Sequence, residues 1–415
     1  MSGHKNLIPV FSNPGNQNIS LFYLFVTFLK VGSIAWGGFM ALIAVIQKQL
    51  VEKDKVIKEE MILDGISLAS VLPGPLAFNV VTYVGYQLRG ITGALVSMTG
   101  VLLPSFLMVL LLSVGYAEYG ELPVFNRFFM GIVPAITAVV LSVAVTMVQK
   151  QVKDYKQMII CVLAASALIF FHAFYITLLI ILVSGFFGYL LYKVPGKVAE
   201  TDERMELTVN YRKIVIICFS ALIVLLGTGL IFYFLFPGNS ERIKLLQSIF
   251  LTFSGLSVTL FGGGYVMIPA MQQVIVDSLH WLSNKEFTDA IAMGQITPGP
   301  ILISATFIGF KMAGFWGALV ATIGIFFPPG LIIIVFSGLL NRIRNSSTVN
   351  SIFKGMRPAI TGMIISATFS IGKGAVYAWP SLAIFLIIFG VLLKFKLNVV
   401  YLIPLAGIAG IIFFK

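Results

Sequence analysis

The sequence predicts an all-α polytopic membrane protein made of two repeats in inverted topology, each containing broken helices. Hydrophobic residues are 58% of the chain and charged residues only 11%, whereas a soluble domain has about 25% charged residues. Long charge-free runs recur along the chain, and roughly 20 residues are enough to cross a bilayer as a helix. An unusual pattern of glycines and prolines also occurs twice at the same spacing. We expect about 13 hydrophobic segments.

The chain divides into five predicted segments. Residues 1–19 are polar, do not have the pattern of a cleaved signal peptide, and are expected in the cytoplasm. The two repeats are expected over residues 20–192 and 245–415. Between them, residues 193–213 mix Lys and Arg with Asp and Glu and predict a cytoplasmic linker. Residues 214–240 are apolar and predict an extra transmembrane helix with no counterpart in the first repeat.

The repeated pattern joins a pair of glycines to a later Pro-Gly-Pro. In a membrane chain, helix breakers at corresponding positions of two halves are the best sequence indication of a transporter's binding site. The spacing between the two motifs is the same in both copies. The copies are Gly37-Gly38 with Pro73-Gly74-Pro75, and Gly262-Gly263 with Pro298-Gly299-Pro300.

Each Pro-Gly-Pro is expected to end one helix and begin another. Proline removes a backbone donor and clashes with the preceding turn, and it disfavours a helical conformation for the residue before it. The second proline suits the first position of a new helix. Unpaired backbone groups in lipid cost several kcal/mol each, so the break predicts burial in protein or a polar cavity. The alternative is ordinary helix packing, because Gly and Pro are common in membrane helices.

The new helix starts are candidate anion sites, because their free N–H groups and the positive end of the helix dipole attract negative charge. Two such ends, related by symmetry near the middle of the bilayer, could hold a small dianion. The predicted substrate-binding residues beside the glycine and proline motifs are Leu76, Ala77 and Asn79 in the first copy and Thr297, Ile301, Leu302 and Ser304 in the second.

Four charged residues within apolar segments are further candidates. Lys30 and Arg357 are predicted oxyanion ligands, Arg357 through two parallel hydrogen bonds. The alternative for both is a side chain that reaches the membrane interface. Asp64 and Asp289 occupy equivalent positions before the two Pro-Gly-Pro motifs. They are candidates for proton coupling or a salt bridge, and the alternative is a helix end at the water interface.

Loop charges predict the membrane orientation. Basic residues favour the cytoplasmic side, which places Lys150 inside and Glu118 outside. Arg342 in the second repeat then falls inside, although the equivalent loop of the first repeat falls outside. The repeats therefore enter the membrane in opposite senses, an arrangement that supports alternating access. If residues 214–236 do not span, the repeats are parallel instead.

Several functional classes are not expected. The net charge of +12 comes from basic residues scattered over short loops, as membrane topology produces, so no nucleic acid is expected as a partner. Cys161 and Cys218 lie in apolar runs and the three histidines are isolated, so neither a metal nor another cofactor is predicted. No HExxH, GxSxG or P-loop motif indicates an enzyme or an ATP-driven pump. The many small helix residues make a homodimer plausible.

These motifs resemble those of the chromate ion transporter (CHR) family in its two-domain form. The resemblance covers roughly residues 20–190 and 245–415, and the paired motifs in order are specific. The residues that carry it are Phe261-Gly262-Gly263-Gly264-Tyr265 and Gln295-Ile296-Thr297-Pro298-Gly299-Pro300 in the second half, and Gly37-Gly38 and Leu72-Pro73-Gly74-Pro75 in the first.

The resemblance implies a secondary transporter that moves chromate across the bacterial inner membrane and confers chromate resistance by efflux. It also implies sulfate as a competitor or exchange partner. Chromate and sulfate are tetrahedral dianions of similar size, so the predicted site does not separate them. The alternatives are a passive oxyanion channel and a carrier for a different tetrahedral oxyanion.

Overall fold

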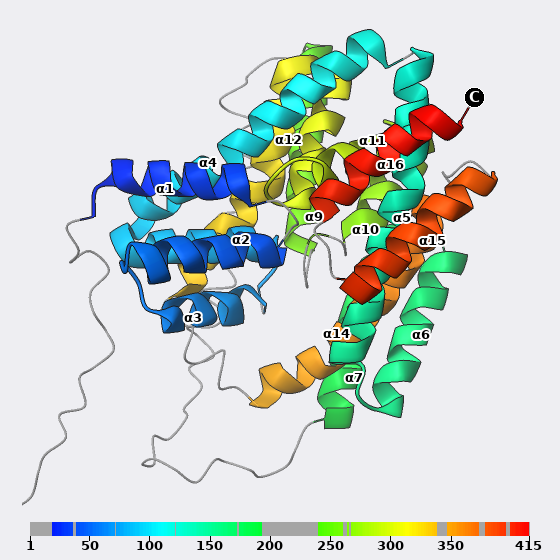
Figure 1. The fold of residues 1–415 in the computed structure, drawn as a ribbon. Helices are drawn as coiled ribbons and strands as arrows, with labels where there is room; N and C mark the ends of the chain where they lie inside the picture. Colours follow the sequence, from blue (N-terminus) through cyan, green and yellow to red (C-terminus); the bar gives the residue numbers. More distant parts are fainter. Residues whose placement is uncertain are drawn as a thin grey trace, which may run out of the picture.

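The computed structural model describes residues 19–35, 39–70, 72–120, 122–171, 174–192, 240–259, 264, 267–337, 347–372, 378–395 and 399–414, and their regular structure is all helical (Figure 1). The predicted glycine pairs Gly37-Gly38 and Gly262-Gly263 lie outside these ranges. So do the linker over 193–213 and, apart from Ser240, the extra helix over 214–240. The loop charges indicate opposite orientation of the repeats only if that helix spans the membrane, so this orientation stays a prediction.

The helices of the two halves follow one another in a matching order. The first half contains α1 (Leu21–Ile34), α2 (Phe39–Ile46), η1 (Gln47–Lys53), α3 (Glu59–Ala69), α4 (Leu76–Tyr119), α5 (Pro123–Gln151), α6 (Tyr155–Phe170) and α7 (Phe174–Tyr192). The second half contains α9 (Glu241–Thr259), α10 (Met267–Gln272), η3 (Gln273–Ser278), α11 (Asn284–Gln295), η4 (Ile301–Ile303), α12 (Ser304–Phe336), α14 (Ser347–Gly372), α15 (Trp379–Phe395) and α16 (Val399–Phe413).

Helix α4 has 44 residues and folds back on itself. A straight helix of that length would measure about 66 Å, twice the hydrocarbon thickness of a bilayer. Arg89 (φ −143°, ψ 25°) and Gly90 (φ 63°, ψ −150°) leave the helical conformation. A Cβ added to Gly93 would overlap the carbonyl oxygen of Gly85, although eight residues of straight helix would separate them by about 12 Å. The chain therefore reverses into a short arm (residues 76–88) and a long arm (residues 91–119).

Helix α12 repeats this reversal at the equivalent place. Ala313 (φ −145°, ψ 25°) and Gly314 (φ 62°, ψ −149°) adopt almost the same angles as their counterparts in α4. The hydroxyls of Thr306 and Thr322 meet at 2.7 Å across the fold. The second short arm is residues 301–312, which include η4, and the second long arm is residues 315–336. The sequence repeat is thus also a repeat of backbone geometry.

The two long arms pack against each other in antiparallel directions. The side chain of Met98 lies against Gly330. Farther along α4, the ring of Phe106 lies edge-on to Phe315, with centroids 6.4 Å apart. Residue numbers therefore rise along one arm as they fall along the other. This pair of helices forms the centre of the molecule, where α4 and α12 meet in Figure 1.

The last helices of each repeat also pack against helices of the other repeat. Helix α5 of the first repeat packs against α15 and α16 of the second, and α14 of the second packs against α6 and α7 of the first. The close approaches are made at glycines: a Cβ on Gly131 would overlap the carbonyl oxygen of Ala406, and one on Gly355 would overlap that of Ser184. Small residues at helix contacts are typical of membrane proteins. The halves are therefore interlocked.

The outer helices present large apolar side chains outward, as expected for contact with lipid. By length and composition, three stretches of the described residues are suited to cross a membrane: α4, α5, and η4 together with α12. These observations fit a multi-pass membrane protein. Examples of the exposed side chains are Leu163 and Ile159 on α6, Phe186 on α7, Ile387 on α15 and Ile412 on α16.

Replacing Gly93 with alanine is expected to destabilise the fold. The added methyl group overlaps the backbone of Gly85, and overpacking of this kind costs about 1–3 kcal/mol. Gly115 in the same helix is the matched control, because a Cβ there meets nothing within 4 Å. Thermal unfolding of the purified protein in detergent should show a lower midpoint for Gly93→Ala than for the wild type. The midpoint of Gly115→Ala should equal that of the wild type. Equal midpoints for the two variants would contradict the reversal of α4.

Candidate functional site

The first Pro-Gly-Pro forms the tip of a helical hairpin. Helix α3 ends at Ala69, and α4 begins at Leu76 after Pro75, which has an extended conformation (φ −67°, ψ 114°). Gly65 of α3 lies against Tyr83 of the short arm, so the two helices run side by side in opposite directions. The predicted helix end and restart are confirmed. The sequence did not indicate that the chain also reverses there.

The second Pro-Gly-Pro forms an equivalent tip. Helix α11 ends at Gln295, and Pro300 (φ −78°, ψ 136°) precedes the single 3₁₀ turn η4. A Cβ on Gly294 of α11 would lie 2.7 Å from the carbonyl oxygen of Ile301, which again places the helix beside the short arm. The N–H of Ile303 donates to the carbonyl oxygen of Pro300 at 3.0 Å. This amide, predicted to be free, therefore has a partner.

Each tip packs against the long arm of the other repeat. The tip glycines have positive φ angles, 113° at Gly74 and 96° at Gly299, which favour glycine. A Cβ on Gly74 would overlap Pro329 of α12, and one on Gly299 would overlap the hydroxyl of Ser105 of α4. Ser105 and Pro329 are themselves equivalent, because each follows a proline that the two halves share. The contact between the repeats is reciprocal.

Two hydrogen bonds hold the second tip. The hydroxyl of Ser105 donates to the carbonyl oxygen of Pro298 at 2.5 Å. The N–H of Gly299 donates to the carbonyl oxygen of Ala35 at 3.0 Å. Ala35 ends α1, immediately before the segment with the first glycine pair. The second tip thus contacts both the first and the fourth helix of the other repeat.

Polar groups without protein partners lie beside both tips. Leu76 and Ala77 are the first two residues of α4. Their N–H groups therefore have no acceptor within the helix. Ser304 is 0% exposed, and its hydroxyl has no hydrogen-bond partner in the described part of the chain. Asn79 is also 0% exposed. Its amide nitrogen donates to the carbonyl oxygen of Pro73 at 2.9 Å, whereas its Oδ1 has no partner among the described residues.

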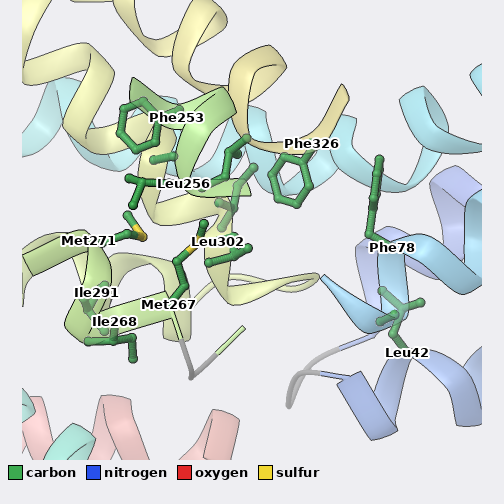
Figure 2. Close-up of a cluster of buried hydrophobic side chains, with 14 of the residues drawn as sticks. Leu42, Phe78, Phe253, Leu256, Met267, Ile268, Met271, Ile291, Leu302 and Phe326 are labelled. Atoms are coloured by element: carbon green, nitrogen blue, oxygen red, sulfur yellow. The ribbon is translucent and has the colours of Figure 1, made fainter. Parts of the chain in front are cut away.

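Buried apolar side chains from both tip regions, including Phe78 and Leu302, are drawn in Figure 2. Phe78 of the short arm faces Phe326 of α12 with ring centroids 5.0 Å apart. Leu302 of η4 and Met267 of α10 belong to the same hydrophobic cluster, and both are buried. Thr297 is buried too, and its hydroxyl donates to the carbonyl oxygen of Met293. The breaks are therefore enclosed by protein, as the cost of unpaired backbone in lipid requires.

The two predicted basic ligands are both exposed. Lys30 is exposed on α1, close enough to Asp54 for its charge to act on that carboxylate. Arg357 is exposed on α14, and its guanidinium carbon lies 5.8 Å from the ring centroid of Phe353. Both side chains thus differ in burial from the polar groups at the tips.

The equivalent aspartates have different surroundings. Asp289 in α11 is 1% exposed, and the hydroxyl of Tyr116 donates to its Oδ2 at 2.7 Å. Its Oδ1 is buried without a hydrogen-bond partner in the described part of the chain. Asp64 in α3 is only half-buried. The predicted water-interface position does not fit the burial of Asp289.

Three important contact residues were not predicted from the sequence: Ser105, Tyr116 and Pro329. For Ser105 and Pro329 a signal existed, because the prolines before them recur at equivalent positions. Tyr116 joins a residue 173 positions away, and no spacing pattern indicates such a pair.

Comparison with known proteins assigns the family. The model of the family described as "Chromate transporter" matches residues 22–189 and 247–411. An uncharacterized transporter of Methanocaldococcus jannaschii is 29% identical over 95% of this chain and 94% of its own. A probable chromate transport protein of Synechococcus elongatus is 31% identical over 94% of both chains. A chromate transport protein of Cupriavidus metallidurans is 28% identical over 90% of this chain and 88% of its own.

No solved structure matches the chain at a significant level. The family match covers both halves, including the two hairpin tips, and it is a match to transporters and not to enzymes. The chain therefore belongs to the chromate transporter family and carries two copies of its domain.

Proposed function

We propose that this chain is a secondary carrier that moves chromate, or another tetrahedral dianion such as sulfate, across the bacterial inner membrane by alternating access. In this role it would confer chromate resistance by efflux. The names of two relatives support chromate as the substrate. The observation that carries the mechanism is the reciprocal packing of the tips, Gly74 on Pro329 and Gly299 on Ser105.

The antiparallel long arms support inverted repeats. Equivalent helices that pack in opposite directions are related by a two-fold axis perpendicular to them. If the long arms span the bilayer, that axis lies in the membrane plane, which is the symmetry of inverted repeats. Exchanging the conformations of the two repeats then converts an inward-open carrier into an outward-open one.

The tips offer neutral donors to a dianion. The N–H groups of Leu76 and Ala77 lie at the positive end of the short arm of α4, and Ser304 adds a hydroxyl. Neutral donors suit a carrier that must also return empty, because a buried unpaired cation would be costly in that state. Asn79 instead shapes the first tip through its bond to Pro73. Lys30 and Arg357, which are exposed, would raise the local concentration of anions near the protein.

A passive oxyanion channel is the second candidate, and counterflow separates the two. We expect purified protein in liposomes to take up radiolabelled chromate faster when the lumen holds unlabelled chromate, because a carrier returns loaded. Luminal sulfate should accelerate uptake in the same way if both dianions share the site. A channel would show no acceleration by either anion at a fixed membrane potential. Liposomes without protein give the background, and no protein-dependent flux at all would contradict the proposal.

Ser304→Ala is expected to weaken chromate binding without destabilising the protein. A hydrogen bond to a charged group contributes about 1.5–3 kcal/mol, so the concentration for half-maximal counterflow should rise about 10- to 100-fold. The Ser304 hydroxyl has no partner among the described residues, so removing it leaves none of their polar groups newly unpaired. Ser113→Ala is the matched control, because Ser113 is equally buried in α4 and its hydroxyl donates to Val109. Equal kinetics for Ser304→Ala and wild type would exclude Ser304 from the site.

Gly299→Ala is expected to abolish counterflow, because its Cβ overlaps Ser105 at the contact between the repeats. The control is Gly314→Ala, which has a similarly positive φ but meets nothing within 4 Å. Both variants should lose about 1–2 kcal/mol of stability from the left-handed conformation. Transport by Gly314→Ala should persist. If both variants transport chromate equally, contact at the second tip has no part in the cycle.

A further inference from the structure

Asp289 is a buried acid that forms no ion pair with any residue that the structure describes. One of its oxygens accepts a hydrogen bond from Tyr116, and the other has no partner among the described residues. The charged groups that act on it are Lys285 and Glu286, both on its own helix. Glu286 is itself paired with Lys311 of α12 at 3.0 Å. Lys311, which also lies over the ring of Tyr116, is therefore already engaged in an ion pair.

A buried carboxylate in this environment is costly to keep charged, because burial removes its hydration and the hydrogen bond from Tyr116 replaces only part of it. A proton on Oδ1 removes the charge, while Oδ2 remains an acceptor for the Tyr116 hydroxyl. Ionisable groups at such positions in membrane proteins commonly mark ion pathways or proton relays. In the protonated state Asp289 is therefore uncharged and keeps its hydrogen bond from Tyr116.

The bond from Tyr116 joins the two repeats. Tyr116 lies at the end of the first long arm, and its ring packs edge-on against Phe129 and Phe307, with centroids 5.6 and 5.1 Å away. The side chain of Lys311 lies 5.8 Å from the centroid of the same ring. The hydroxyl is thus held in place. A hydrogen bond to a carboxylate is stronger than one to a neutral carboxyl group, so protonation of Asp289 weakens a contact between the repeats.

A proton is the ion that this site fits best. A hard metal cation such as Ca²⁺ requires about six to eight oxygen ligands. The described residues contain no cluster of three or more His, Cys, Asp or Glu side chains that could hold one. A single free carboxylate oxygen is enough for a proton.

We propose that Asp289 binds and releases the proton that couples chromate movement to a pH gradient, with Tyr116 as its positioning partner. This inference rests on the carrier function proposed above. Proton binding on Oδ1 loosens the contact between α4 and α11, and proton release tightens it. Because one acid changes both its proton and the contact between repeats, the two conformations of the carrier differ in proton affinity. Asp64, which is half-buried, has no part in this coupling.

The test separates coupling from exchange. In liposomes with the membrane potential clamped, an imposed pH gradient should drive chromate against its own gradient through the wild-type protein. Asp289→Asn keeps an acceptor for Tyr116 but cannot bind the proton. This variant should lose gradient-driven accumulation by about tenfold or more, within the range of typical coupling free energies, while counterflow at equal pH is retained. Asp64→Asn is the matched control and should retain both activities.

A second variant tests the proposal independently, in case Asp289→Asn does not fold. Tyr116→Phe keeps the acid but removes the bond that favours its ionised form, so the pH profile of counterflow should shift to higher pH. An unchanged profile would overturn the proposal. So would full pH-driven accumulation by Asp289→Asn, or accumulation in the wild type driven by a sodium gradient and not by pH. In each of these cases wild-type counterflow persists, whereas failure of the carrier proposal would remove it.

Discussion

The structure depends on the need to cover broken backbone inside a membrane. Each Pro-Gly-Pro leaves groups that lipid cannot satisfy, and the other repeat covers part of each tip. The tip with Gly74 rests on Pro329, and the tip with Gly299 rests on Ser105. This requirement explains why the long arms cross at the centre and why α5 and α14 pack with helices of the opposite repeat. A chain that breaks two helices in lipid has to interlock its halves.

Equivalent backbone positions form the contact at each tip, but the side chains that make the two contacts differ. Ser105 donates a hydrogen bond to the second tip, whereas its counterpart Pro329 has no hydroxyl or backbone N–H to donate to the first tip and meets it through carbon atoms. The second tip is also bonded to Ala35. A carbon contact has little directional preference, so it permits sliding that a hydrogen bond resists. The contact of the first tip with Pro329 therefore allows more sliding than the contact of the second tip with Ser105.

Local chemistry explains what the sequence predicted. Proline and glycine act on their own backbone, so the helix ends at Ala69 and Gln295 and the restart after Pro75 were predictable. The reversals at Gly90 and Gly314 were not, because a single glycine in an apolar run is compatible with a continuous helix. The pairing of Tyr116 with Asp289 depends on how distant helices pack. Likewise, a lysine in an apolar run does not reveal which face of the helix carries it.

Alternating access needs two conformations of similar free energy, and a duplicated scaffold supplies them because each repeat can adopt the other's shape. Bonds that exist in only one repeat make the two conformations unequal. Tyr116 with Asp289 and Ser105 with Pro298 are bonds of this kind. A ligand shifts such an equilibrium only by its difference in affinity for the two states. The oxyanion proposed at the tips and the proton proposed on Asp289 would act on different contacts between the two repeats. The asymmetry between the repeats is thus what allows one ligand to influence the other.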